Sequence, residues 1–172
     1  PDDHFTDSEL LAMYVEQVEG LCEGGADALI FETFTTLDDL LLALQAGRQV
    51  AGARLPFIAQ LVYGGGAAAS GESSQEAAAR LLAAGADVVG ANCGRGLQSM
   101  RQALDGLLAA ANERGYVSLY PNAGYPELIG GRTVYMGTPD YMARQAAQWA
   151  RQGVRLIGGC CGTTPETIRA IH

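Results

Sequence analysis

The sequence contains no lysine and only two histidines, which lie at positions 4 and 172. Because both histidines stand at the ends of the chain, general-base catalysis by histidine is nearly excluded. Any metal site in the middle of the chain must therefore be built from sulfur and oxygen ligands. No run of about 18 apolar residues is present, so we expect no transmembrane helix and no membrane partner.

The charge pattern argues against nucleic-acid binding. The net charge is −8, and the basic residues are all arginines scattered along the chain. The acidic residues 1–4 are followed by no apolar signal region, so we expect a cytoplasmic protein. With 172 residues, of which 48% are hydrophobic and 17% charged, the chain is long enough to form one domain with a buried core.

The chain repeats a unit of an apolar strand, a loop and an amphipathic helix, at intervals of roughly thirty residues. The strands are almost continuously apolar, which is typical of a parallel sheet covered on both faces. A loop from about Gly124 to Gly137 delays the last unit. Ser73, Thr138 and Thr164 are expected to cap helices. The predicted strands are 28–34, 56–63, 87–93, 116–122 and 155–161, and a helix over about residues 8–23 precedes them.

Five strands would suit an open sheet, but the polar residues favour a barrel. They follow the carboxyl ends of four different strands, and such ends converge at the top of a (β/α)₈ TIM barrel. We therefore predict a TIM barrel of which residues 1–172 supply the last five strand-helix units, the first three being absent. The two exposed parallel edges of an isolated piece would favour association or aggregation, and the remaining part of the barrel is an expected partner. The strand-end residues are Glu32, Asn92, Cys93, Asn122, Cys160 and Cys161.

Three of the four cysteines lie at predicted strand ends, which indicates a zinc site. Adjacent Cys160 and Cys161 are flanked by glycines that let the backbone bend both sulfurs toward one ion, with Cys93 as the third ligand. The alternative is that all three are buried as small hydrophobic residues. A structural zinc site would need a fourth ligand, whereas Cys22 lies late in a helix. Three ligands and one open position indicate catalysis.

Three thiolates also predict what the fourth ligand is. They offset the charge of the ion and make it a weak activator of water. A substrate thiol binds well and loses its proton at neutral pH. The expected reaction is attack by sulfur on an electrophilic carbon, that is, alkyl transfer to a thiol.

At these residues the chain resembles the zinc-dependent homocysteine S-methyltransferase family, which includes the homocysteine-binding barrel of methionine synthase. The resemblance covers nearly the whole chain in the right order, and its last segment is long and specific. The matching segments are Ile30–Phe34, Gly90–Cys93, Tyr120–Gly124 and Gly158–Glu166.

The resemblance implies a role for each of these residues. Cys93, Cys160 and Cys161 would hold Zn²⁺, and Glu32 would pair with the ammonium group of L-homocysteine. Asn122 would lie near the zinc, in the position later taken by substrate, and Asn92 would shape the site. The implied product is methionine. The implied methyl donor is methylcobalamin or 5-methyltetrahydrofolate, which a carrier domain could present, while betaine and S-methylmethionine are alternatives.

Two other functions remain open from the sequence. A non-catalytic zinc-stabilised fragment or interaction module would need a fourth protein ligand and would not bind thiols. A phosphate-binding barrel enzyme would use the last glycine-rich turn and the helix beginning at Thr164 as an anion site, but this leaves the paired cysteines unexplained. The glycine run 64–66 has no lysine after it and is expected to form a mobile loop over the pocket.

Overall fold

The computed structural model describes residues 5–112 and 114–172, so the acidic residues 1–4 lie outside the described part of the chain. Its centre is a parallel sheet whose strands are arranged in the order in which they occur in the sequence. This confirms the predicted order of strands and helices. The sheet consists of β1 (Leu29–Phe34), β2 (Phe57–Leu61), β3 (Val88–Cys93), β4 (Tyr116–Pro121) and β7 (Leu156–Ile157), in that order.

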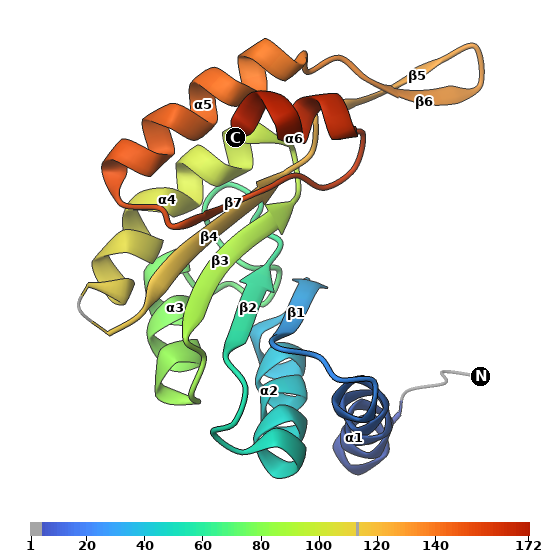
Figure 1. Ribbon diagram of the computed structural model, residues 1–172, viewed down its shortest axis with the longest axis vertical. Helices are drawn as coiled ribbons and strands as arrows, with labels where there is room; N and C mark the ends of the chain where they lie inside the picture. Colours follow the sequence, from blue (N-terminus) through green and yellow to red (C-terminus); the bar gives the residue numbers. More distant parts are fainter. Residues whose placement is uncertain (1–4, 113) are drawn as a thin grey trace.

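The helices alternate with these strands, and Figure 1 shows α2 to α5 following one another along one face of the curved sheet. Ser73, Thr138 and Thr164 accept hydrogen bonds as N-caps, as predicted. No helix in the described ranges is both long and apolar enough to cross a bilayer. The helices are α1 (Asp7–Glu23), α2 (Leu37–Ala51), α3 (Ser74–Ala83), α4 (Leu97–Ala111), α5 (Pro139–Gln152) and α6 (Pro165–Ile171).

The two faces of the sheet differ in polarity. Phe31 and Phe57 pack edge to face beside Gly47 of α2, and together they belong to the buried core between sheet and helices. On the other face, Gln60 donates a hydrogen bond to Ser118 at 2.8 Å. In a barrel this second face would be the interior, so its polar residues lie on the side where substrate is expected.

The segment between β4 and α5, predicted as a loop over 124–137, is a β-hairpin. Its strands β5 (Pro126–Ile129) and β6 (Arg132–Tyr135) pair antiparallel and project from the sheet (Figure 1). Gly130 and Gly131 connect them with φ of 58° and 77°. Two positive φ values in a two-residue connection are the signature of a type I′ turn, which glycine forms readily.

The fifth predicted strand, 155–161, is regular only over Leu156–Ile157. The chain nevertheless continues beside β4, since the Gly158 N–H donates to the Leu119 carbonyl at 3.1 Å and the Cys160 N–H to the Pro121 carbonyl at 2.8 Å. The first positive φ in this segment is at Gly162, directly after the two cysteines. The prediction was therefore right about the position of this strand and wrong about its length.

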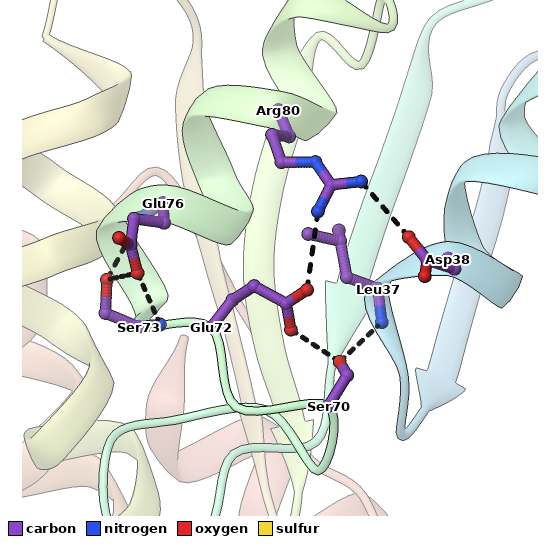
Figure 2. A network of polar contacts seen from close by, with 7 residues as sticks. All are labelled: Leu37, Asp38, Ser70, Glu72, Ser73, Glu76 and Arg80. Carbon is purple, nitrogen blue, oxygen red and sulfur yellow. Dashed lines mark hydrogen bonds and ion pairs between the residues drawn. The ribbon is translucent and has the colours of Figure 1, made fainter.

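Specific contacts organise the loop between β2 and α3, which contains the glycine run 64–66. Ser70 accepts a hydrogen bond from the Leu37 N–H at 3.2 Å, and Arg80 bridges Glu72 at 3.3 Å and Asp38 at 3.1 Å (Figure 2). These exposed ion pairs are individually weak. Together, however, they join the loop to the start of α2 and to α3, and so hold it at the carboxyl ends of the strands.

Close contact between β3 and β4 makes Gly90 sensitive to substitution. A Cβ atom at Gly90 would overlap the backbone and hydroxyl of Ser118, whereas a Cβ at Gly20 of α1 would meet nothing within 4 Å. We expect Gly90→Ala to lower the free energy of unfolding by about 2–3 kcal/mol or more. Gly20→Ala should raise it by roughly 0.5–1 kcal/mol through helix propensity. Urea denaturation measures both, and equal effects would contradict the assigned contact.

Candidate metal centre

The structure brings the three predicted ligand cysteines together. Their sulfur atoms all lie within 4.8 Å of one another, and those of Cys160 and Cys161 are 3.9 Å apart. Tetrahedral zinc with Zn–S bonds of about 2.3 Å places its sulfur ligands about 3.8 Å apart. The three side chains therefore have nearly the spacing that one such ion requires.

Cys93 reaches this position through an unusual backbone conformation at the end of β3. Its φ is 60°, one of two positive values among the non-glycine residues that the structure describes. Such a conformation costs of order 1–3 kcal/mol and is found preferentially at functional sites. The turn that follows is held by a hydrogen bond from the Arg95 N–H to the Ser99 hydroxyl at 2.8 Å.

Cys160 and Cys161 lie in a tight turn after β7. Thr163 closes this turn, because its hydroxyl donates to the Cys160 carbonyl at 2.7 Å and its N–H to the same oxygen at 3.2 Å. Gly162 has φ of 76°, and any side chain there would overlap the ring of Tyr135. The predicted role of the glycines thus has a specific basis at Gly162, where both the conformation and the contact require glycine.

Asn122, predicted near the metal, lies between the two cysteine-bearing segments. It is buried, and its amide nitrogen donates to the Cys93 sulfur at 3.6 Å and to the Gly94 carbonyl at 3.0 Å. Its amide oxygen accepts from the Cys161 N–H at 3.0 Å. One side chain at the end of β4 therefore joins the turn after β3 to the turn after β7.

Asn92 and Glu32, the other two predicted site residues, lie on the same side of the sheet. Asn92 is fully buried, and its amide nitrogen is 3.3 Å from a carboxylate oxygen of Glu32 and 4.0 Å from the Cys160 sulfur. The exposed carboxylate of Glu32 is thereby connected to the cysteine cluster through a single residue. Cys22 is half-buried in α1 against the core, as predicted, and is not part of the cluster.

Sequence reasoning gave no role to two tyrosines near these groups. Tyr120, on β4, is half-buried, and its pKa is raised by burial and by the negative charge of Glu32. Tyr135 comes from the hairpin, and its pKa is raised by desolvation, then by a hydrogen bond with Cys161 and by the other two cysteines. The paired glycines 130 and 131 are typical of a hairpin turn. A hairpin at this position would have predicted that the chain runs back toward the cysteines at Tyr135.

The electrostatics of the cluster call for a cation. Desolvation raises the pKa of the Cys160 thiol to about 11, and the neighbouring Cys161 and Cys93 contribute to the rise. A thiol with such a pKa is protonated at neutral pH. Sulfur atoms at this spacing can become thiolates together only when a positive ion balances their charge.

A parallel α/β sheet with three cysteines clustered at the carboxyl ends of its strands is typical of barrel-type proteins, and similarity to known proteins identifies the family. The family model for homocysteine S-methyltransferase matches residues 1–172. The chain belongs to the homocysteine S-methyltransferase family.

Named relatives agree with this assignment. The methionine synthases of Mycobacterium leprae and Mycobacterium tuberculosis are each 36% identical over 163 residues, or 92% of this chain. The chain spans only 13% and 14% of those two proteins. The homocysteine methyltransferase MmuM from Escherichia coli, in its apo form, superposes with a TM-score of 0.77 at 26% identity, covering 99% of this chain and 58% of that one. Its metallated form gives the same TM-score.

Replacing one cluster cysteine should remove the metal. With Cys160→Ser, we expect zinc content to fall from about one per chain to near zero, since serine is a poor ligand for this ion. Cys22→Ser is the matched control, because Cys22 is outside the cluster, and it should keep its zinc. Elemental analysis after dialysis measures both. Full zinc in Cys160→Ser would exclude the assignment of this ligand.

Zinc affinity should depend steeply on pH. Because the pKa of Cys160 is raised to about 11 in the metal-free protein, its thiol is protonated at neutral pH and must lose a proton when the metal binds. We therefore expect apparent zinc affinity to rise from pH 6 to pH 8, with proton release on binding. Competition against a chelator at several pH values measures this. A flat profile would show that thiolates are not the ligands.

Proposed function

We propose that the chain binds Zn²⁺ through Cys93, Cys160 and Cys161 and uses it to transfer a methyl group to L-homocysteine. The observation that carries this proposal is the convergence of three sulfurs within 4.8 Å at the carboxyl ends of a parallel sheet. Sulfur ligands suit zinc. Three protein ligands leave one position of a tetrahedral ion for a substrate. The metallated form of MmuM supports a metal in this fold.

When bound, zinc with three thiolate ligands would lower the pKa of a substrate thiol and so supply a sulfur nucleophile near pH 7. In the transfer, a carbon–sulfur bond forms to the methyl group while the bond between methyl and donor breaks. The thiol proton is lost to solvent. The protein's own residues serve this reaction mainly by binding and orientation.

Each of the remaining site residues has a defined part in this proposal. Glu32 places a carboxylate on the exposed rim of the sheet, where it would pair with the ammonium group of homocysteine. Asn122 holds the turns of Cys93 and Cys161 at their mutual distance through three hydrogen bonds. Asn92 joins Glu32 to the cluster. Asn122 thus acts through its contacts with the cysteine-bearing turns.

We propose methylcobalamin or 5-methyltetrahydrofolate as the methyl donor. Residues beyond this chain would bind part of the donor and present it to the site. The support is the similarity to proteins named methionine synthase. A pocket of about 260 Å³ lies between the β2–α3 loop and the turn after Cys93. Part of a donor could bind in this pocket, next to the cysteines. Its lining includes Tyr63, Gly94 and Arg95.

We further propose that residues 1–172 are the last five units of a homocysteine-binding barrel whose other units lie elsewhere. The chain covers 58% of MmuM in the superposition, which supports this division. Free cysteines agree with a reducing, cytoplasmic site of action. Production of methionine from L-homocysteine and methylcobalamin by the zinc-loaded protein, together with its remaining barrel units, tests the proposal. Absence of product with both proposed donors would contradict it.

The Glu32 carboxylate provides a sharper test of substrate binding. Glu32→Gln should raise the homocysteine concentration needed for half-maximal activity by roughly tenfold to a hundredfold, because a charge-assisted hydrogen bond is worth about 1.5–3 kcal/mol. Zinc content should not change. Glu16→Gln, on the exposed side of α1, is the matched control and should match the parent protein. Loss of zinc in Glu32→Gln would show that the carboxylate serves the metal instead.

A further inference from the structure

The end of β1 contains an irregularity at the residues beside Glu32. Phe31 pairs with Ala59 and Phe34 with Leu61, so three steps along β1 match two steps along β2. This is a β-bulge, a feature that bends a strand and re-aims a side chain. Thr33, inside the bulge, has φ of 67°, which is a strained conformation for a β-branched residue.

Two reciprocal hydrogen bonds with Asn92 hold Thr33 in this conformation. The Thr33 N–H donates to the Asn92 amide oxygen at 2.9 Å, and the Asn92 amide nitrogen donates to the Thr33 hydroxyl at 2.7 Å. Asn92 itself is fully buried and directly precedes Cys93. The reciprocal pair therefore fixes the bulge of β1 against the end of β3, where the first cysteine of the cluster begins its turn.

This pair lies between the two groups that would bind the ends of a substrate. The Asn92 amide nitrogen is also 3.3 Å from the Glu32 carboxylate and 4.0 Å from the Cys160 sulfur. The distance from the carboxylate to the sulfur cluster is thus set through one buried side chain and the bulge that it holds. A change in the bulge would move Glu32 while leaving the three cysteines on their own elements.

We propose that Thr33 is a positioning residue that fixes the span between Glu32 and the metal centre, and thereby selects thiols whose amine is three carbons from sulfur. This inference rests on the proposed function. Homocysteine has that spacing, and cysteine is one methylene shorter. A rigid span discriminates between two such ligands, since one methylene typically changes binding by tenfold or more. The hydroxyl of Thr33 supplies the rigidity.

The experiment measures binding of simple aminothiols to the Co²⁺-substituted protein, carrying its remaining barrel units, from the change in its visible spectrum. The pair 3-mercaptopropylamine and 2-mercaptoethylamine differs only in the one methylene. We expect the parent protein to bind the longer amine roughly tenfold or more tightly. Thr33→Val removes the hydroxyl and keeps the shape, and it should bring this ratio close to one. Thr33→Ser keeps the hydroxyl and should retain most of the preference.

The possible outcomes separate the inference from the function on which it rests. An unchanged ratio in Thr33→Val, with normal metal content, would overturn the role of Thr33 and leave the proposed function intact. Loss of metal in Thr33→Val would also overturn it, because the residue would then serve the metal site. No spectral response of the parent protein to any thiol would overturn the proposed function, and the inference with it. Glu32→Gln should abolish the preference through loss of the amine partner.

Discussion

The rest of the site depends on the close approach of three sulfur atoms from segments far apart in the sequence. Cys93 ends β3, and Cys160 and Cys161 follow β7, yet their sulfurs lie within 4.8 Å of one another. Since β4 lies between those strands, its register and the side chain at its end set the separation. Thiols at this spacing repel one another when ionised, and burial opposes ionisation further. The arrangement is therefore complete only with a cation, which links the chemistry of the site to the stability of its turns.

Two buried asparagines hold together the ends of strands where the regular ladder of backbone hydrogen bonds stops. Asn92 joins the bulge of β1 to the end of β3, and Asn122 joins the turns after β3 and β7. An amide carries both donors and an acceptor, so it can satisfy N–H and carbonyl groups that face each other across a gap. A carboxylate would lack the donors and would add negative charge beside thiolates. The asparagines therefore keep the strand ends in place without opposing the binding of anionic sulfur.

The strand-helix repeat and the cysteines could be predicted from the sequence because each depends on local pattern. Apolar runs and capping residues indicated the five strands and the helices that follow them, and glycines around Cys160 and Cys161 indicated a bent backbone. The bulge at Thr33 could not be predicted, because a β-branched residue normally avoids positive φ and adopts it here through contacts with Asn92. The position of Tyr135 beside the cysteines was not predicted, because the segment 124–137 was expected to be a loop, although the Gly130–Gly131 pair is typical of a hairpin turn. Local sequence pattern therefore predicted the order of strands and helices and the ligand cysteines. The bulge and the hairpin contacts depend on residues far apart in the sequence, so local pattern did not predict them.

The hairpin of β5 and β6 is fixed at its base and open to solvent at its tip. At the base, the Gly137 N–H donates to the Ala123 carbonyl at 2.7 Å, and the Ala123 N–H donates to the Cys161 carbonyl at 2.9 Å. At the tip, a Cβ atom added to Gly130 or Gly131 would meet no other atom within 4 Å, and Leu128 is 78% exposed. Residues can therefore be inserted at the tip with little effect on the cysteines. This makes the tip a suitable position for a fluorophore or an affinity tag placed away from the cysteine cluster.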